Sequence, residues 1–225
     1  MGRMSKGSFA SLVCGCLMLA ACGNAQSDEE VVLTHGSSIV PDQTIEDLVT
    51  YGDVAVVFEV VSESELSPSK EERARGEGTI TREVVAQQVG EPVWVRPTRS
   101  KSAPRPEKRW EISDGGWLFH GKKRTRMLAE GQDTLVVGSR YLAVRTYSSI
   151  SGLPPEWFSL TYIPLEDGQV RFSKRALSGS TPDLKRLQGV ADDKVADLLD
   201  STKPDPAAVP YMKLDAYERY GKVDG

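Results

Sequence analysis

The chain has 225 residues, of which 39% are hydrophobic and 27% are charged, and its formal net charge is −4 at pH 7. This composition is that of an ordinary soluble domain, and the acidic balance argues against a dedicated nucleic-acid-binding protein. With only two histidines, His35 and His120, the sequence lacks the parts of a multi-histidine metal site or of a robust Ser-His-Asp triad.

Residues 1–21 have the order of charge and hydrophobicity of a secretory signal. Arg3 and Lys6 precede an apolar segment from Phe9 to Ala21, and no acidic residue occurs before Asp28. The apolar segment, about 13 residues, is shorter than the roughly 20 that cross a bilayer as a helix. Export followed by removal of residues 1–21 is therefore favoured over a permanent membrane span. The mature chain would keep 26 basic against 32 acidic residues, because the leader carries two basic ones.

The leader ends in Leu19-Ala20-Ala21-Cys22, which brings small residues and a thiol together at the cleavage point. This motif resembles the lipobox of bacterial lipoproteins. The resemblance implies that diacylglycerol and further acyl chains such as palmitate modify Cys22 and anchor the chain to the extracytoplasmic face of the cell membrane. Cys14 and Cys16 fall in the leader, so Cys22 is the only thiol of the mature chain and no intrachain disulfide can form. Catalysis by Cys22 as a nucleophile is the alternative.

The first part of the mature chain is predicted to be extended, then helical. Residues 22–41 are mostly polar or small and predict a flexible tether between lipid and domain. Thr44 and Asp47 have the spacing of a capping box, which predicts a short helix over residues 44–50. Residues 53–62 are dense in β-branched side chains and predict a strand.

Two polar loops separate the next elements. Residues 67–78 contain a proline, two glycines and a mixed charge run, and they predict a solvated loop. A strand over residues 79–89 is expected to pair with the preceding strand as a long-looped hairpin. A second loop, residues 96–109, is basic and stiffened by three prolines.

The second half of the chain changes from strands to helices. Two short strands are predicted at residues 110–113 and 116–120, around a turn at Asp114-Gly115-Gly116. Further strands are predicted at residues 138–147 and 157–164, and residues 170–172 are expected to form the hairpin partner of the latter. Apolar residues then recur at helical spacing from Leu184 to Leu199, and a short amphipathic piece covers residues 211–220.

Strands in the middle with helices at the two ends predict a mainly β, α+β fold. The expected architecture is a small five- to six-stranded OB-like barrel over residues 42–175, with a short N-terminal helix and a helical C-terminal extension, residues 176–225, packed on it. Residues 52–172 are weakly similar to OB-type and netrin-like barrels. Netrin-like modules usually carry disulfides, which cannot form here, so their inhibitory function is not transferred.

A cationic patch is the candidate binding feature. Its residues contrast with the acidic chain and lie near three tryptophans, so the patch would suit an anionic envelope polymer or phospholipid headgroups. A solvated basic loop, with the tryptophans in the core, is the alternative. The candidate residues are Arg96, Arg99, Lys101, Arg105, Lys108, Arg109, Lys122, Lys123, Arg124 and Arg126.

The sequence offers no catalytic residue, metal ligand set or cofactor motif. His120 is interpreted as a polar residue at a strand end, and the acidic pairs Glu63 with Glu65 and Asp192 with Asp193 as surface charge, although such pairs can do acid–base chemistry across a cleft. No glycine-rich loop has the spacing that wraps backbone amides around a phosphate.

These observations favour a membrane-anchored extracytoplasmic lipoprotein that acts as a non-enzymatic binding or interaction module of the cell envelope. Its partners would be the membrane, through the lipid, and an envelope protein or anionic polymer, with no nucleic acid. Two alternatives stay open: an envelope hydrolase or transferase whose carboxylates are assembled by the fold, and a structural subunit of an envelope assembly.

Overall fold

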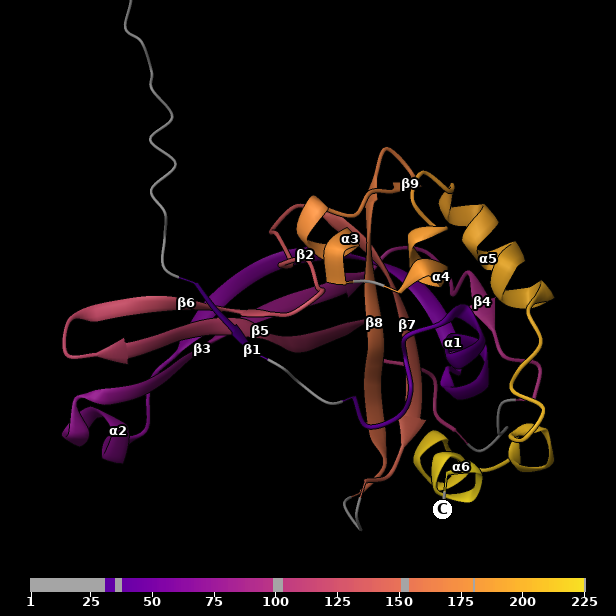
Figure 1. Ribbon diagram of the computed structural model, residues 1–225, viewed down its shortest axis with the longest axis horizontal. Coiled ribbons are helices and arrows are strands. Elements are labelled where there is room, and N and C mark those ends of the chain that lie inside the picture. The colour runs from indigo at the N-terminus through magenta and orange to yellow at the C-terminus, as the bar shows by residue number, and fades with distance from the viewer. Residues whose placement is uncertain (1–30, 35–37, 99–102, 151–153, 180, 225) are drawn as a thin grey trace, which may run out of the picture.

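The computed structural model describes residues 31–34, 38–98, 103–150, 154–179 and 181–224, and a single mixed sheet organises them (Figure 1). Its strands are β1 (Val31–Thr34), β2 (Val54–Leu66), β3 (Glu77–Gln88), β4 (Trp94–Val95), β5 (Arg109–His120), β6 (Lys123–Ala129), β7 (Arg140–Ser148), β8 (Glu156–Glu166) and β9 (Gln169–Val170). The helices are α1 (Ile45–Tyr51), α2 (Lys70–Arg75), α3 (Lys174–Gly179), α4 (Pro182–Lys185), α5 (Asp192–Ser201) and α6 (Ala216–Val223), with a 3₁₀ turn η1 (Val209–Tyr211).

The predicted mainly β, α+β fold is confirmed, but the sheet is larger than expected and open. Among the described residues it has nine strands in the order β1-β6-β5-β3-β2-β7-β8-β9, with β4 on β2, and this order does not return to its start. All ladders are antiparallel except that β1 runs parallel to β6. The expected closed barrel of five or six strands is therefore an open sheet.

The middle of the sheet nevertheless curls like a barrel. The ring of Phe58 in β2 lies 5.3 Å from the ring of Trp110 in β5 and 5.9 Å from the ring of Tyr162 in β8, measured between centroids. β5 and β8 lie on opposite sides of β2 in the strand order, so both reach Phe58 only because the twisted sheet bends around it. We call the gap between the facing edges of β5 and β8 the seam.

Apolar side chains pack on both faces of the curled sheet. The concave face holds a cluster built from Val54, Val56, Phe58, Val60, Val84, Ala86, Ile112, Leu135, Tyr141, Ala143 and Trp157. The convex face, with Ala55, Leu142, Val144, Leu160 and Ile163, packs against apolar residues of α1, α4, α5 and α6. Coverage on both sides explains the uninterrupted apolar run at the start of β2, because a strand buried on both faces has no polar side.

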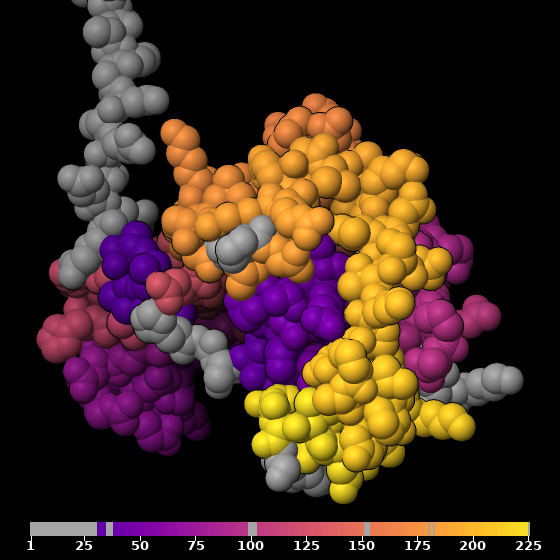
Figure 2. Space-filling model, turned by 45° about the vertical axis from the view of Figure 1, so that its right-hand side comes forward, coloured from indigo at the N-terminus to yellow at the C-terminus, as the bar shows by residue number. Residues whose placement is uncertain are grey.

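The molecule divides into two regions, which we call the head and the arm. The arm comprises residues 31–34, 61–81 and 116–129, and the head comprises the other described residues. The arm projects to the left in Figure 1 as a ribbon of β2, β3, β5, β6 and β1, with α2 at its end. In Figure 2 the orange and yellow C-terminal helices cover the head around the indigo α1, while the arm lies to one side. Within the arm ranges Gly116, at the base, is the single buried residue.

Some of the elements predicted from local sequence are confirmed, and one predicted loop contains a helix. The capping box of α1 is confirmed, since the Thr44 hydroxyl accepts from the Asp47 N–H and the Asp47 carboxylate accepts from the Thr44 N–H. The hairpins of β2 with β3 and of β8 with β9 are confirmed too. The loop predicted at residues 67–78 instead contains α2, because Ser69 and Glu72 form a second capping box.

The two short strands predicted around Asp114-Gly115-Gly116 are one continuous strand, β5. Both glycines have positive φ, 66° and 140°, and the register places Asp114 and Gly115 together opposite Arg82, which is a bulge rather than a turn. A Cβ on Gly116 would lie 2.1 Å from the Ile80 carbonyl oxygen, so the close approach of β3 requires glycine here.

The predicted tether, residues 22–41, is described only in part. Val31–Thr34 form β1 on the edge of β6, and Val40 is buried in the convex core, so these pieces are attached to the domain. The leader and Cys22 lie outside the described residues. Among the described residues, no helix is both long and apolar enough to span a bilayer.

Candidate functional site

The ten residues of the predicted cationic patch do not form one surface. Arg105, Lys108 and Arg109 are exposed before and at the start of β5, whereas Lys123, Arg124 and Arg126 pair with its far half and Lys122 lies in the turn that follows it. At about 3.3 Å per residue, the 8 to 11 steps from Arg109 to Trp117 and His120, the partners of Arg126 and Lys123, separate the two groups by roughly 26 to 36 Å. Lys108 also approaches Glu91, at 3.9 Å. Arg99 and Lys101 lie outside the described residues.

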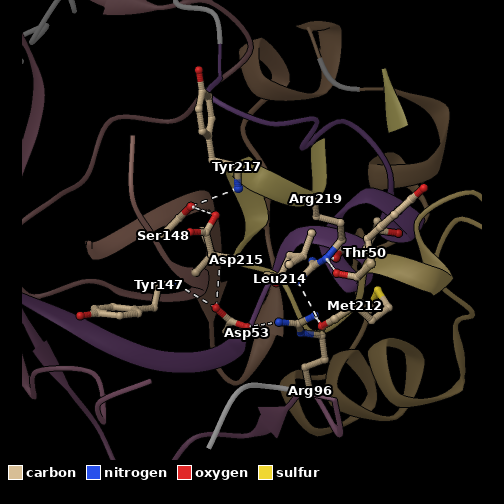
Figure 3. Close-up of polar contacts among 12 residues, drawn as sticks. Thr50, Asp53, Arg96, Tyr147, Ser148, Met212, Leu214, Asp215, Tyr217 and Arg219 are labelled. Carbon is tan, nitrogen blue, oxygen red and sulfur yellow. Dashed lines mark hydrogen bonds and ion pairs between the residues drawn. The ribbon is translucent and has the colours of Figure 1, made fainter. Parts of the chain in front are cut away.

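Arg96 is buried and belongs to a polar network inside the head (Figure 3). Its guanidinium pairs with the Asp53 carboxylate and donates to the Met212 carbonyl at 2.9 Å. The second Asp53 oxygen accepts from the Thr146 hydroxyl at 3.0 Å and from the Tyr147 N–H at 2.8 Å. Arg96 thus ties the chain after β4 to β2, β7 and the C-terminal segment.

Arg219 of α6 completes this network and is fully buried. Its guanidinium donates to the backbone carbonyls of Thr50 and Leu214, with longer bonds to Tyr211 and Met212. Burial, helped by the nearby Arg96 charge, lowers the pKa of Arg219 to about 10. Because its guanidinium is hydrogen-bonded to backbone carbonyls of both segments, Arg219 holds α6 against the end of α1 and has a structural role.

Asp215 caps α6 and connects it to the end of β7 (Figure 3). Its carboxylate accepts from the Ser148 hydroxyl at 2.8 Å, from the Ser149 hydroxyl at 3.0 Å and from the Glu218 N–H at 2.9 Å. Burial alone would raise the pKa of Asp215, but these hydrogen bonds outweigh it and hold the pKa below its ordinary value. A cavity of about 280 Å³ is lined by Asp53 and Asp215, whose carboxylates already have partners, and by the exposed Glu218.

The predicted acidic pairs do not meet across a cleft. Glu63 pairs with Arg82, and Glu65 pairs with Arg124 at 2.8 Å. Asp192 and Asp193 stand together in the first turn of α5. His120 is exposed at the arm tip, 3.4 Å from Glu77, and His35 lies outside the described residues. None of the described groups among these faces a second one across a cavity, as acid–base chemistry requires.

A second polar cluster fixes the base of the arm. Arg82 is 4% exposed, and its guanidinium contacts the carboxylates of Glu63 and Asp114 and the Leu135 carbonyl. Burial raises the pKa of Asp114, although the Leu135 N–H and the Arg82 charge act in the opposite direction. The β5 bulge brings Asp114 to this position, so the bulge and the buried ion pairs depend on each other.

Beyond this cluster, the arm carries a cation–aromatic group on the same face as Arg82. The guanidinium carbons of Arg124 and Arg126 lie 4.4 and 4.8 Å from the ring centroid of Trp117. Trp117 stands opposite Arg126 in the β5–β6 register, and Val31 of β1 stands opposite Arg126 on the other side. All of these side chains are at least partly accessible.

The seam holds a cavity of about 310 Å³. Its lining combines aromatic and aliphatic side chains with several hydroxyl groups. The residues are Ser38, Ile39, Val40, Trp110, Glu111, Ile112, Ser113, Thr146, Ser148, Ile150, Trp157, Phe158, Ser159, Leu160, Tyr162 and Ala216. The cavity exists because the edges of β5 and β8 face each other without a ladder between them in the described chain.

Arg145 lies next to the aromatic wall of the seam cavity. Its guanidinium carbon is 4.2 Å from the ring centroid of Trp110 and 5.6 Å from that of Trp157. Its charge is partly balanced by Glu107 at 3.6 Å, whose side chain is 59% exposed, and its Nε and Nη1 make no hydrogen bond within the described structure. Burial lowers the pKa of Arg145, and Glu107 raises it. An incompletely neutralised positive charge therefore stands beside the cavity.

Sequence reasoning missed the buried arginines Arg82, Arg145 and Arg219. A signal existed for the first two, because each is a cation inside a strand of apolar and β-branched residues, where a buried charge needs a partner. The partners, however, come from segments distant in sequence, such as Glu107 and the Leu135 carbonyl. For Arg219 the amphipathic C-terminal piece gave no such signal.

Comparison with protein-family models, with curated proteins and with solved structures gave no match. The described residues also contain no group of three or more His, Cys, Asp or Glu side chains arranged to hold a metal ion.

Proposed function

We propose that this chain is an exported lipoprotein, anchored through Cys22 on the extracytoplasmic face of the cell membrane, and that its head is a non-enzymatic binding module. The anchor rests on the motif at residues 19–22. The observation that carries the binding role is the seam cavity, whose volume of about 310 Å³ lies within the range of natural ligand pockets.

The chemistry of the seam favours a compact ligand with an apolar body and an anionic or strongly electronegative group. The rings of Trp110 and Trp157 would bury the apolar part, and the hydroxyls of Ser113 and Ser159 would orient the polar part. The positive charge of Arg145 beside the cavity would attract the anionic group. A short segment of an envelope protein or of an anionic polymer has this character.

The alternative of an envelope hydrolase or transferase has less support. Such an enzyme needs two free carboxylates that face each other across a cavity. Glu111 is the single carboxylate in the lining of the seam cavity. In the neighbouring cavity Asp53 and Asp215 are engaged in hydrogen bonds, which leaves Glu218 as the one other carboxylate of that lining.

Mass spectrometry of the protein purified from its own membranes tests the anchor. We expect an amino-terminal peptide that begins at Cys22 and carries diacylglycerol. A bare Cys22 that still follows Ala21 would contradict the anchor.

Native mass spectrometry of the same preparation tests the binding role. A bound molecule is expected on the native chain and is expected to be lost in the Ser159→Trp variant, because an indole at residue 159 would fill the cavity. Ser178→Trp places the same ring on an exposed helix residue and should leave the complex intact. Equal occupancy in both variants would show that the ligand does not use the seam.

A further inference from the structure

We infer that the β6 edge of the arm lies on the anionic headgroup surface of the anchoring membrane, with the head directed away from the bilayer. This inference rests on the proposed lipid anchor at Cys22 and identifies the surface of the domain that faces the lipid. Three independent features of the described arm support it: the direction of β1, the distribution of charge and the Trp117 group.

The direction of β1 puts its first residue towards the arm tip. β1 pairs in parallel with β6, from Val31 opposite Arg126 to Thr34 opposite Ala129. Because β6 begins at the tip, Val31 is the end of β1 that lies nearer to it. Nine residue steps separate Cys22 from Val31, so the two lie at most about 32 Å apart. The lipid is therefore attached within this reach of the β6 edge.

Charge is distributed unequally across the arm. The β6 edge carries Lys122, Lys123, Arg124 and Arg126, and residues 121–129 include no acidic side chain. The other side of the ribbon is mixed in charge and acidic on balance, with Glu63 and Glu65 in β2, Glu77 in β3, and two acidic against three basic residues in α2. Arg124 reaches across to Glu65, so one of the four cations is partly neutralised. β1, the first strand after Cys22 in the chain, pairs on this cationic edge.

The same edge offers side chains suited to a membrane interface. Tryptophan is enriched at the headgroup level of bilayers, and Trp117 stands among the guanidinium groups of Arg124 and Arg126. Val31 and Leu33, 41% and 47% exposed, continue the edge with apolar surface. A cationic edge with an aromatic centre matches anionic phospholipid headgroups, each cation contributing roughly fivefold in affinity.

Depth-dependent quenching on the lipidated full-length protein tests the orientation. Because Cys22 is acylated, a cysteine introduced by Thr125→Cys on β6 or by Ser178→Cys on α3 is the only free thiol, and each can carry the same fluorophore. The protein is reconstituted in phosphatidylcholine vesicles with or without phosphatidylglycerol and with spin-labelled lipid. The probe at residue 125 should be quenched in the phosphatidylglycerol vesicles, and the probe at residue 178 should not.

A variant without the cations of the β6 edge tests whether their charge causes the contact with the membrane. Replacing Lys122, Lys123, Arg124 and Arg126 by glutamine should abolish quenching at residue 125. The matched control replaces Lys185, Arg186, Lys203 and Lys213, four exposed cations of the head, and should leave it unchanged. In the unlipidated Cys22→Ser form, the first variant should bind phosphatidylglycerol vesicles more than tenfold less tightly than its parent.

The outcomes separate the inference from the anchor. If neither probe is quenched in the lipidated protein, the orientation is wrong and the anchor is unaffected. If the same edge binds a soluble anionic polysaccharide instead of the vesicles, the orientation is wrong as well. A bare Cys22 in the native protein would remove the anchor whatever the probes report.

Discussion

The head and the arm are built from the same strands, yet they are stabilised in different ways. β2 crosses both: Val54 to Val60 lie in the head and are buried with one partial exception, and Val61 to Leu66 lie in the arm and are exposed. The head buries apolar side chains on both faces of the sheet, whereas the arm is held by ladders and turns and by the buried polar cluster of Arg82 where it joins the head. The comparison teaches that the arm depends on the head for its position, while the head does not depend on the arm.

Arg219→Met should have the largest effect, because it removes the donors that satisfy buried carbonyls between α1 and α6. Orphaned buried acceptors, together with the loss of a charge that helps balance Asp53, should lower the free energy of unfolding by about 3–4 kcal/mol. Urea denaturation of the whole chain measures this. Arg171→Met, at an exposed arginine bonded to Gln169, should change stability by less than about 0.5 kcal/mol. Similar values for both variants would show that the head network is dispensable.

Arg82→Met should lower the stability of the arm more than that of the head. Removing the guanidinium leaves Asp114, which is 17% exposed, without its ion-pair partner, and it frees the Leu135 carbonyl. We expect a loss of about 2–3 kcal/mol that is concentrated in the arm. Hydrogen exchange should show lost protection in β5, β6 and β1, while β7 and β8 keep theirs. Loss of protection throughout the head would contradict the division into two regions.

Asp215→Asn should weaken the head by about 1 kcal/mol at neutral pH, since an amide still caps α6 but no longer offers a charged acceptor to Ser148 and Ser149. The pKa of Asp215 is lowered in the folded chain, so its contribution is complete above its ordinary value of 3.8 and is lost as pH falls through the lowered value. The stability difference between the native chain and the variant should therefore shrink below about pH 3.8. A difference that stays constant with pH would mean that the charge has no role.

Ser69→Ala should have the smallest effect. The change removes the cap of α2, and similar losses elsewhere cost about 1 kcal/mol of helix stability. Because α2 has no buried residue, its fraying should leave the global unfolding free energy within about 0.5 kcal/mol of the native value. Exchange rates in residues 70–76 should rise alone. A large global loss would show that the arm stabilises the head after all.

The sequence predicted the elements whose signals are local. The capping box of Thr44 and Asp47, the β-branched run of β2 and the turn at Glu166-Asp-Gly168 each lie within a few residues, and each appears at its predicted place. Predictions based on glycine were less successful, because Gly115 and Gly116 form either a turn or a bulge depending on the neighbouring strand. The predicted cationic patch was wrong for a similar reason, because β5, a strand of 12 residues, separates in space two groups of charges that are close in sequence.

The sequence by itself determined the mainly β class, the order of the hairpins and the lipobox-like motif at Cys22. Hydrophobic periodicity, helix-capping residues and leader motifs are short-range properties of the chain. The tertiary structure alone decided which arginines are buried, that β5 and β8 face each other across a seam, and that β1 enters on the cationic edge of the arm. These features depend on contacts between residues that are tens of positions apart, and no local pattern encodes the partner of a buried charge.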